Sequence, residues 1–500
     1  MMRAYSNSPK QWLYKAGVLL IVFVSFYFYA PCRFFLFNSD QAVHVMMLKH
    51  FSWPHDAYYW GQNRLGSFLP LVTWPFYKLL PFHPLVTISL IHYVLLFVSW
   101  YLLAGLLRSD LGRLVLCVAM FLPLSSYYYF ILIGHPYEAQ LFCLCVSVFS
   151  FNKVRLLLLS EQTGVRLFVW HFIAILFGVL AYWVSEFSAL VFLFAGIYAW
   201  LCKPLRTKIL EGLVWKNKSA GALILLSVLY LGIGFFAIRD LKQNLTSDTL
   251  YDQLFITQGS DIRKEFGYLS RQTLDTLGFK DPRAFFENAF YACLVVLVPW
   301  SIWLLRKLPD NRQVLMKSLL WSILAGCVLL FFSSWNYHSF FGAKYFSILY
   351  VLIFIPVLAS AECMKPPLLR GISGVLLICM LGSGYLFCFR HVGEPTVFER
   401  YGNIKQIRKG TLVCDYWNCY AMNAVAFDSL QSFPMEAWSQ RNSHQMEQLK
   451  QSDFFYFFDD ANLPHKSTKD TVHYFGFDMV RTGTVYPVQG QSLMQYRKLK

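Results

Sequence analysis

The chain has 500 residues, of which 56% are hydrophobic, 18% are aromatic and only 14% are charged. Soluble domains carry about 25% charged residues and rarely contain apolar runs near twenty residues, whereas this sequence contains about ten such runs. The composition excludes a soluble protein and predicts an all-α polytopic membrane protein, so the net charge of +16 has to be explained by its distribution along the chain.

Eleven transmembrane helices fit the hydropathy of the sequence. An odd number of spans places the two termini on opposite sides of the membrane. The expected spans lie at 14–30, 85–107, 114–133, 137–152, 167–183, 186–201, 219–238, 289–305, 315–333, 342–360 and 370–389.

The basic residues gather on one side of the membrane when the N-terminus is cytoplasmic. The cytoplasmic segments are then 1–15, 108–113, 153–166, 202–218, 306–317 and 361–370. They hold 19 Lys and Arg against five acids, a net charge of +14, which leaves +2 for the opposite side. This asymmetry follows the positive-inside rule, so we expect no nucleic-acid partner. The exit of the first apolar run, 29–33, lacks a small-x-small cleavage site, and we expect an uncleaved anchor.

Two segments on the extracytoplasmic side are longer than connections between helices need to be. Residues 31–84 include an apolar stretch, 65–80, that two prolines interrupt. This stretch predicts an interfacial or re-entrant helix rather than a span. Residues 239–288 are polar and show helical periodicity over 262–277.

From residue 390 onward the composition becomes that of a soluble domain. The runs CDYWNCY (414–420), AVAF (424–427) and FFYFF (454–458) predict strands, and 439–449 predicts a helix. We therefore divide the chain into a transmembrane domain, 1–389, and a small extracytoplasmic α/β domain, 390–500.

The twelve cysteines form no zinc pattern with histidine, and most lie inside apolar runs, which indicates small buried side chains. Cys414 and Cys419 fall in the soluble domain, where they can pair in an oxidising compartment. Their spacing alone does not establish a disulfide. No metal ligand set is visible.

Few charged side chains lie near the outer membrane face, and these are the candidates for a site. They are Asp40, Lys49, Asp56, Arg64, Lys78, Glu138, Glu186 and Lys344. Because they lie at similar depth in this topology, we expect them to converge on one cavity at the outer leaflet. Asp40 follows the first span by about ten residues, and an ionisable group at such a depth suggests a functional site. The aromatic and glycine-rich stretch behind it can lie in the interface.

A carboxylate and a lysine at such a cavity suit one chemistry. A sugar attached to a polyprenyl phosphate cannot leave the bilayer, so its transfer takes place at the interface. A base takes the proton from the acceptor hydroxyl, and a cation stabilises the departing phosphate. A carboxylate that acts on the face opposite the phosphate inverts the anomeric centre, by the geometry of inverting glycosidases.

Each candidate also has a purely structural interpretation. Asp40 can cap the helix that follows it, Glu138 can be an acid favoured by a helix dipole, and Glu186 can pair locally. Lys78 and Lys344 can extend to the headgroups. The histidines of this face, His44, His50, His55 and His135, are more typical of interfacial polar residues than of metal ligands.

Several stretches resemble a known family. SDQAVHVMMLKHF (39–51) and YYWGQNRLGSFLPLVTWPFYKLL (58–80) resemble the first extracytoplasmic loop of bacterial GT-C glycosyltransferases, in particular the prokaryotic relatives of the protein O-mannosyltransferases and of the aminoarabinose lipid A transferase. ILIGHPYEAQLFCLCVSV (131–148) and LFGVLAYWVSEFSALVFLFAGI (176–197) add to the similarity. CDYWNCYAMNAVAF (414–427) resembles the Tyr-Trp-x-x-Tyr stretch of the family's outer domain.

The resemblance implies a GT-C fold, a lipid-linked sugar donor and catalysis on the extracytoplasmic face. Asp40 matches the family's catalytic acid, and Lys344-Tyr345 resembles an Arg-Tyr pair where a cation meets the donor phosphate, with Lys78 and Arg64 as further candidates for that role. Gln41 replaces the usual second acid, and Lys344 lacks the bidentate fork of Arg. Some members use a divalent metal and others use none.

The sequence thus predicts an integral-membrane glycosyltransferase of the bacterial inner membrane, with its N-terminus in the cytoplasm and its C-terminal domain outside. Its donor is expected to be a polyprenyl-phosphate sugar and its acceptor an envelope glycan, lipid or protein. Asp40 is the expected base, with Glu138 or Glu186 as a second acid. The alternative is a non-catalytic transporter or flippase of a lipid-linked glycan, which requires charged residues deep in several spans; such residues are almost absent here.

Overall fold

The computed structural model describes most of the chain. The described residues are 9–60, 65–162, 164–214, 216–245, 259–279, 281, 284–333, 343–407, 409–426, 430–434, 449–458, 470–474, 476–488 and 491–499. Arg64 and nearly all of the predicted helix 439–449 lie outside them.

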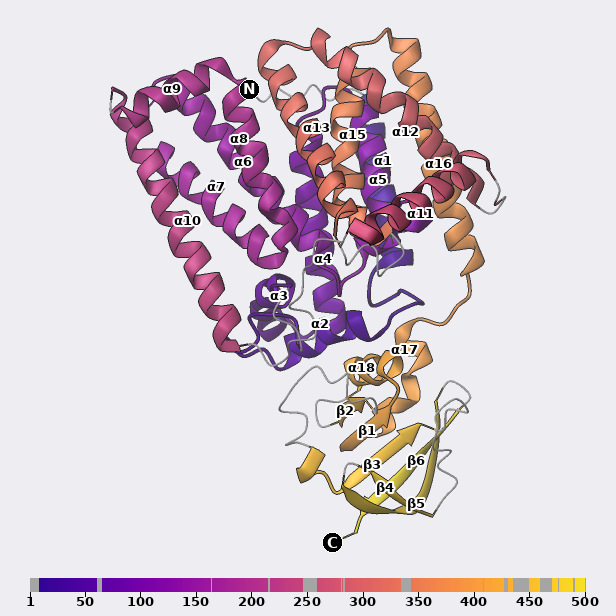
Figure 1. The fold of residues 1–500 in the computed structure, drawn as a ribbon. Helices are drawn as coiled ribbons and strands as arrows, with labels where there is room; N and C mark the ends of the chain where they lie inside the picture. The colour runs from indigo at the N-terminus through magenta and orange to yellow at the C-terminus, as the bar shows by residue number, and fades with distance from the viewer. Residues whose placement is uncertain are drawn as a thin grey trace.

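Long apolar helices dominate the described part of the chain and make it a multi-pass membrane protein (Figure 1). Nine helices there are long and apolar enough to cross a membrane, and the number rises to eleven if two bent pairs each count as one span. The nine helices are α1 (Pro9–Tyr29), α4 (Pro84–Ala104), α6 (Tyr137–Leu159), α7 (Val165–Val184), α10 (Lys218–Leu245), α12 (Phe285–Leu304), α13 (Asp310–Phe331), α15 (Ser347–Ala361, extended by the short helix that holds Lys344) and α16 (Pro366–Arg390). The prediction of about eleven apolar spans agrees with this count.

The two bent pairs correspond to the third and sixth predicted spans. In the first, α5 (Asp110–Phe121) is followed by the 3-10 helix η1 (Ser125–Ile131) at 84°. Pro123 lies in the break between them, where the residue before a proline disfavours the helical conformation. In the second pair, η2 (Glu186–Ala189) and α8 (Leu190–Leu201) meet α9 (Lys203–Leu213) at 98°.

Shorter helices lie outside the spans. α2 (Ser39–Lys49) and α3 (Phe68–Leu79) follow α1, and the 12 residues of α3 are too few to cross a bilayer. α11 (Gly259–Leu277) contains the segment where the sequence predicts helical periodicity, and it contacts α12. α17 (Val397–Arg400) and the 3-10 helix η7 (Gly402–Gln406) lead from α16 into the C-terminal domain.

The C-terminal domain contains a six-stranded mixed sheet, of strand order β2-β1-β3-β6-β5-β4. β1 pairs in parallel with β2 and β3, and the other pairs are antiparallel. The strands are β1 (Gly410–Cys414), β2 (Leu430–Pro434), β3 (Phe454–Phe458), β4 (Thr471–Tyr474), β5 (Phe477–Val488) and β6 (Gln491–Lys498).

The sequence misassigned one part of this domain. FFYFF is strand β3, as predicted, but CDYWNCY is a strand only at Cys414, and the described residues of AVAF, 424–426, are not a strand. Residues Tyr416–Val425 form helix α18 because Asp415 caps it, accepting hydrogen bonds from the backbone N–H groups of Trp417 and Asn418. The cap separates Cys414, at the end of β1, from Cys419, a buried free thiol within the helix.

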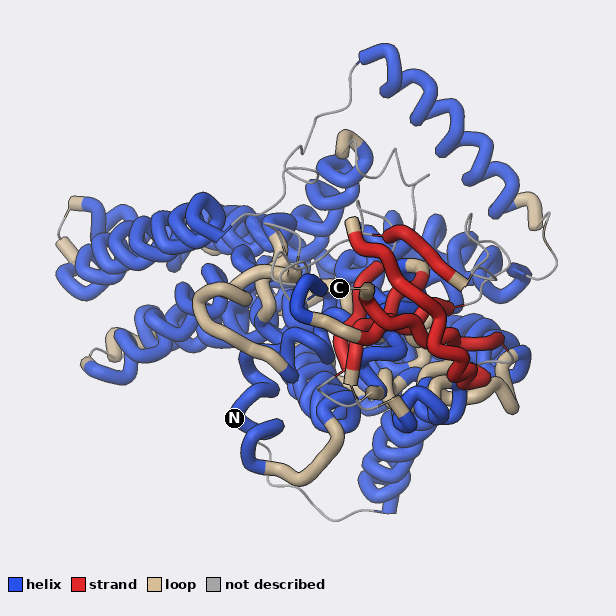
Figure 2. The backbone as a smooth tube through the Cα atoms, turned by 90° about the horizontal axis from the view of Figure 1, so that it is seen from below, coloured by secondary structure: helices blue, strands red, loops and turns tan. Residues whose placement is uncertain are grey.

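The C-terminal domain sits against one end of the helical bundle. Figure 1 shows α18 next to the end where α2 and α3 lie, and Figure 2 shows the strands beneath that end of the bundle. α18 packs on α2, where the buried Lys49 donates from its Nζ to the carbonyls of Asn423 at 3.2 Å and Ala426 at 3.0 Å. Because α2 also contacts α3 and α4, it lies between the helical bundle and the C-terminal domain.

Candidate functional site

Asp40 lies in the first turn of α2 and does not cap it. The cap is Asn38, whose side chain accepts from the backbone N–H of Gln41 at 3.4 Å. The half-buried Asp40 carboxylate is instead held from the C-terminal domain, because the Tyr416 hydroxyl donates to its Oδ1 at 2.6 Å. The backbone of Asp40 is also fixed, since the Tyr59 hydroxyl donates to its carbonyl at 3.1 Å. The capping interpretation of Asp40 is thus wrong.

The loop between η1 and α6 reaches Asp40 through a glycine. Gly134 has φ +92°, and a Cβ there would lie 2.5 Å from the Asp40 carbonyl oxygen. Only glycine permits both the conformation and the approach. The N–H of Gly134 donates to His44 Nδ1 at 2.9 Å, so the loop is locked onto α2 and its next residue, His135, is brought beside Asp40.

His135 lies between a carboxylate and an ammonium group. Burial lowers the pKa of its imidazole to about 4, with Asp40 opposing this shift and Lys344 adding to it. Burial likewise lowers the pKa of His44 to about 3, with His135 and His92 adding to the effect. Both imidazoles are therefore neutral at physiological pH.

Lys344 approaches the same place from the start of α15. Its Nζ lies 5.8 Å from the ring centroid of Tyr129 and 5.2 Å from that of Tyr345. The Tyr129 ring meets the His135 ring edge-on at 5.2 Å. Within the described residues Lys344 makes no ion pair with an acidic side chain, so its charge is available to a ligand.

Glu138 lies behind His135 rather than in the open part of the site. It is fully buried, and its Oε1 lies 3.6 Å from Nδ1 of the equally buried His92. Neither carboxylate oxygen accepts a hydrogen bond. Glu138 lines a small cavity together with His44 and His135.

Glu186 is engaged elsewhere. Its carboxylate pairs with Lys242 of α10. The nearby Tyr58 hydroxyl has its pKa raised by burial first and then by Glu186, and it donates to the carbonyl of Ile238 in the same helix at 3.4 Å. These contacts fasten the turn before α8 to α10.

The remaining predicted cations do not contact Asp40 in the described structure. Lys78 is exposed at the end of α3, where its Nζ lies over the ring of Tyr77 at 5.4 Å. Arg64 lies outside the described residues. Of the predicted site residues, Asp40, Lys344 and Tyr345 lie together, with Glu138 behind them.

Two residues of the site were not identified from the sequence. Tyr416 contacts the Asp40 carboxylate, and the Tyr-Trp-x-x-Tyr resemblance is the signal that pointed to its neighbourhood. Glu287, at the start of α12, accepts hydrogen bonds from the hydroxyls of Ser125, Ser126 and Ser383 and from the N–H of Ser126. This carboxylate holds η1, which carries Tyr129, against α12 and α16.

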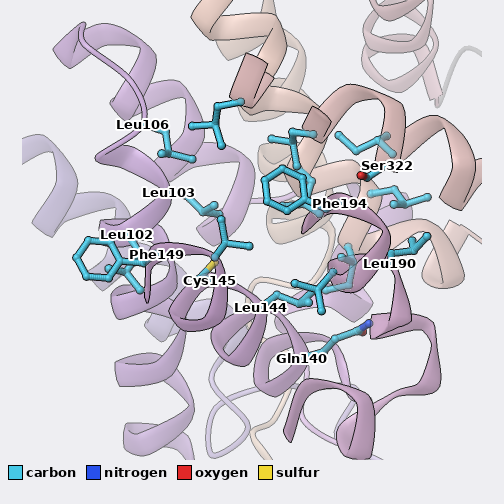
Figure 3. A pocket seen from close by; sticks show the side chains of 18 of the residues that line it. Leu102, Leu103, Leu106, Gln140, Leu144, Cys145, Phe149, Leu190, Phe194 and Ser322 are labelled. Carbon is cyan, nitrogen blue, oxygen red and sulfur yellow. The ribbon is translucent and has the colours of Figure 1, made fainter. Parts of the chain in front are cut away.

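A separate apolar cleft lies within the bundle of apolar helices (Figure 3). Its cavity volume is about 110 Å³, and it lies between α4, α6, α8, α13 and α15. Its lining contains no charged side chain, and its polar members are Gln140, Asn152 and Ser322. Gln140 is buried and its Nε2 has no acceptor, so it offers an unused donor. Ile348 also lines the cleft, one helical turn beyond Lys344.

Metal ligands are not assembled in the described part of the chain. No three His, Cys, Asp or Glu side chains there lie close enough to hold a metal ion. Asp40 and His135 are the neighbouring groups with ligand chemistry, and together they supply fewer ligands than a protein metal site normally has.

Comparisons with known proteins give fold-level likenesses of low similarity. No family model and no curated protein matches the chain. Among solved structures it resembles the oligosaccharyltransferase AglB of Archaeoglobus fulgidus in complex with an inhibitory peptide and a dolichol-phosphate, with a TM-score of 0.48 at 9% identity over 90% of this chain and 70% of that one. The apo form of the A. fulgidus oligosaccharyltransferase gives 0.49 at 9% identity over the same shares. At these values the likeness supports no conclusion about what this chain does.

Proposed function

We propose that this chain is an integral-membrane glycosyltransferase that moves a sugar from a polyprenyl-phosphate carrier to an acceptor outside the cytoplasm. The observation that carries the proposal is the succession of an apolar cleft, an ammonium group with no acidic partner among the described residues, and a held carboxylate. A lipid-linked sugar presents the same three parts in the same order: an isoprenoid chain, a phosphate and an anomeric carbon.

In the proposed complex, the lipid chain of the donor lies in the cleft and the phosphate and sugar lie beyond it, toward Lys344 and Asp40. Its chain occupies the apolar space lined by Ile348, and burial of that surface anchors it. Lys344, one turn above, then meets the phosphate. The free Nε2–H groups of Gln140 are placed to donate to the same end of the lipid. The sugar extends past His135 toward Asp40, whose proximity to Lys344 is supported by the influence of both groups on His135.

The reaction follows from these positions. Asp40 takes the proton from the acceptor hydroxyl, and the oxygen attacks the anomeric carbon on the face opposite the phosphate. The bond between that carbon and the phosphate oxygen breaks, and the electron pair leaves with the polyprenyl phosphate. Lys344 stabilises the charge that develops on the leaving group. The product glycoside has the inverted configuration.

Asp40 acts as the base without a second acid. Glu138 is fully buried and Glu186 is paired with Lys242, so we assign them positioning roles instead of contact with the acceptor. Gln41, which replaces the family's second acid, is also buried, and its Nε2 donates to the Leu36 carbonyl at 3.3 Å. It stabilises the start of α2.

The C-terminal domain, 390–500, completes the site through Tyr416 and bounds the acceptor side together with segment 239–288. We place this domain outside the cytoplasm and the N-terminus inside, in a bacterial inner membrane, on the charge asymmetry of the loops. The acceptor class is an envelope glycan, lipid or protein.

The test is the Asp40→Asn variant in purified membranes supplied with a polyprenyl-phosphate sugar. Loss of a general base is expected to lower transfer about 10²- to 10⁴-fold, while donor binding is retained because the cleft and Lys344 are unchanged. Asp110→Asn is the matched control: it makes the same chemical change in the first turn of another helix, α5, at the opposite membrane face. Full activity in Asp40→Asn removes this residue from the mechanism.

The glycan composition of a strain that lacks the protein identifies the donor sugar and acceptor together. An enzyme leaves the acceptor without one residue. A transporter of lipid-linked glycan instead leaves the completed intermediate trapped on the cytoplasmic side. The uncharged lining of the cleft favours the first outcome, since a phosphate crossing it would lose its hydration without a compensating charge.

A further inference from the structure

Arg155 is a buried cation that the transfer reaction does not use. It lies near the end of α6 farthest from Asp40 and is only 7% exposed. Its Nε and Nη1 have no hydrogen-bond acceptor. Within the described residues, no acidic side chain forms an ion pair with it.

The aromatic neighbour of Arg155 does not replace an anion. The Tyr198 ring centroid lies 5.8 Å from the guanidinium carbon, at the outer limit of a cation–π contact. Such a contact leaves Nε and Nη1 of the guanidinium without an acceptor. A buried charge whose donors are unused carries a desolvation penalty that an anionic acceptor relieves.

Arg155 stands at the far end of the apolar cleft. On α6, Val148 and Asn152 line the cleft, and Arg155 continues the same helix face by one more turn. On α8, Phe194 lines the cleft and Tyr198 follows one turn later. Because helical side chains lean toward the N-terminus of their helix, the Arg155 side chain is directed back toward the cleft.

The cleft therefore has a cation beyond each end. Gln140, at the end nearer Lys344, and Arg155 are 15 residues apart on one helix, which corresponds to about 22 Å along its axis. This is roughly three quarters of the hydrocarbon thickness of a bilayer, about 30 Å. Arg155 consequently lies in the part of the bilayer nearer to the leaflet opposite the Asp40 site.

We propose that Arg155 binds the phosphate of an anionic glycerophospholipid from that leaflet, with the acyl chains of the lipid in the adjoining part of the cleft. The guanidinium fork matches phosphate oxygens, and the apolar lining matches the chains. The site is distinct from the donor site at Lys344 and does not depend on the transfer reaction. The bound phospholipid fills the part of the cleft that lies farthest from the sugar.

The full-length protein is tested in nanodiscs of phosphatidylcholine alone or mixed with phosphatidylglycerol. After extraction in mild detergent, native mass spectrometry measures the phospholipid that remains bound. The wild-type protein is expected to retain phosphatidylglycerol in preference to phosphatidylcholine, and Arg155→Gln to retain it about tenfold less. Arg155→Lys keeps the charge without the fork, so an intermediate loss is expected.

The matched control is Arg166→Gln, which removes an exposed arginine at the start of α7 on the same membrane face and is expected to leave retention unchanged. Equal retention by Arg155→Gln and the wild type overturns the proposal, as does retention of polyprenyl phosphate in place of phosphatidylglycerol. If Arg155→Gln does not fold, the test rests on the wild-type protein alone. Equal retention of phosphatidylglycerol and phosphatidylcholine by the wild type then overturns the proposal. Asp40→Asn should retain the phospholipid, so failure of the transfer mechanism is distinguishable from failure of this site.

Discussion

The hydrogen bond from Tyr416 to Asp40 gives the sharpest test of the site, because it joins two domains at one carboxylate. Tyr416→Phe removes only the hydroxyl that donates to Oδ1 at 2.6 Å and keeps the ring in its buried place on α18. A hydrogen bond to a charged group contributes about 1.5–3 kcal/mol. If that energy holds Asp40 in its reactive position, transfer is expected to fall about 10- to 100-fold.

The assay is the initial rate of sugar transfer from a polyprenyl-phosphate donor, measured with a thermal unfolding curve for each variant. Tyr401→Phe is the matched control, since it removes a hydroxyl that donates to Asn418 at 2.7 Å within the same domain and away from Asp40. The expected pattern is a large loss of rate in Tyr416→Phe alone, with similar unfolding midpoints in both variants. A wild-type rate in Tyr416→Phe, or an equal loss in Tyr401→Phe, refutes the reasoning.

Three further predictions concern neighbouring residues. Lys344→Ala is expected to raise the KM for the donor about tenfold or more, because the charge that meets the phosphate is lost. Lys344→Arg keeps this charge and is expected to retain donor binding. An unchanged KM in Lys344→Ala counts against that role. Gly134→Ala is expected to destabilise the protein by at least about 1–3 kcal/mol in denaturant titrations, since φ is +92° and a Cβ would lie 2.5 Å from the Asp40 carbonyl. Because burial lowers the pKa of His135 to about 4 and that of His44 to about 3, the unfolded chain binds more protons below about pH 6.5. Stability should therefore fall as the pH drops from 6.5 toward 3, and His44→Gln should reduce this dependence in a series of thermal melts.

The number of apolar spans could be predicted well because composition decides it. A bilayer requires about twenty apolar residues for each crossing, and this signal is local in the sequence. The bend at Pro123 was missed because hydropathy continues through the proline and registers one span where the backbone turns by 84°. Hydropathy indicates whether a segment prefers lipid or water, and it carries no information on the direction of the backbone.

The errors in the C-terminal domain have a different cause. The aromatic run at 414–420 favours a strand on propensity, but Asp415 caps a helix there and α2 provides a surface for that helix to pack on. Tertiary packing overrides β-propensity easily because that propensity itself reflects packing against neighbours. The capping signal was present in the sequence as an acid followed by residues compatible with a helix.

The candidate site could be predicted only in part, for reasons of distance along the chain. Asp40 and Lys344 were singled out because both lie close to apolar spans that the sequence reveals, Asp40 after the first span and Lys344 at the start of a later one. The partner of Glu186 is Lys242, 56 positions away, and the partner of Asp40 is Tyr416, 376 positions away. Such pairings decide which acidic side chains are engaged by a partner and which remain open to a ligand. No local sequence pattern encodes these pairings.

The dependence of Asp40 on Tyr416 has a consequence for biosynthesis. Asp40 is synthesised early, whereas Tyr416, whose hydroxyl holds the Asp40 carboxylate, is synthesised after the membrane helices described above. A chain still being translated therefore has Asp40 without the hydrogen bond from Tyr416, so the proposed site is incomplete until helix α18 has been made. The C-terminal domain is thus the last part of the proposed site to be synthesised.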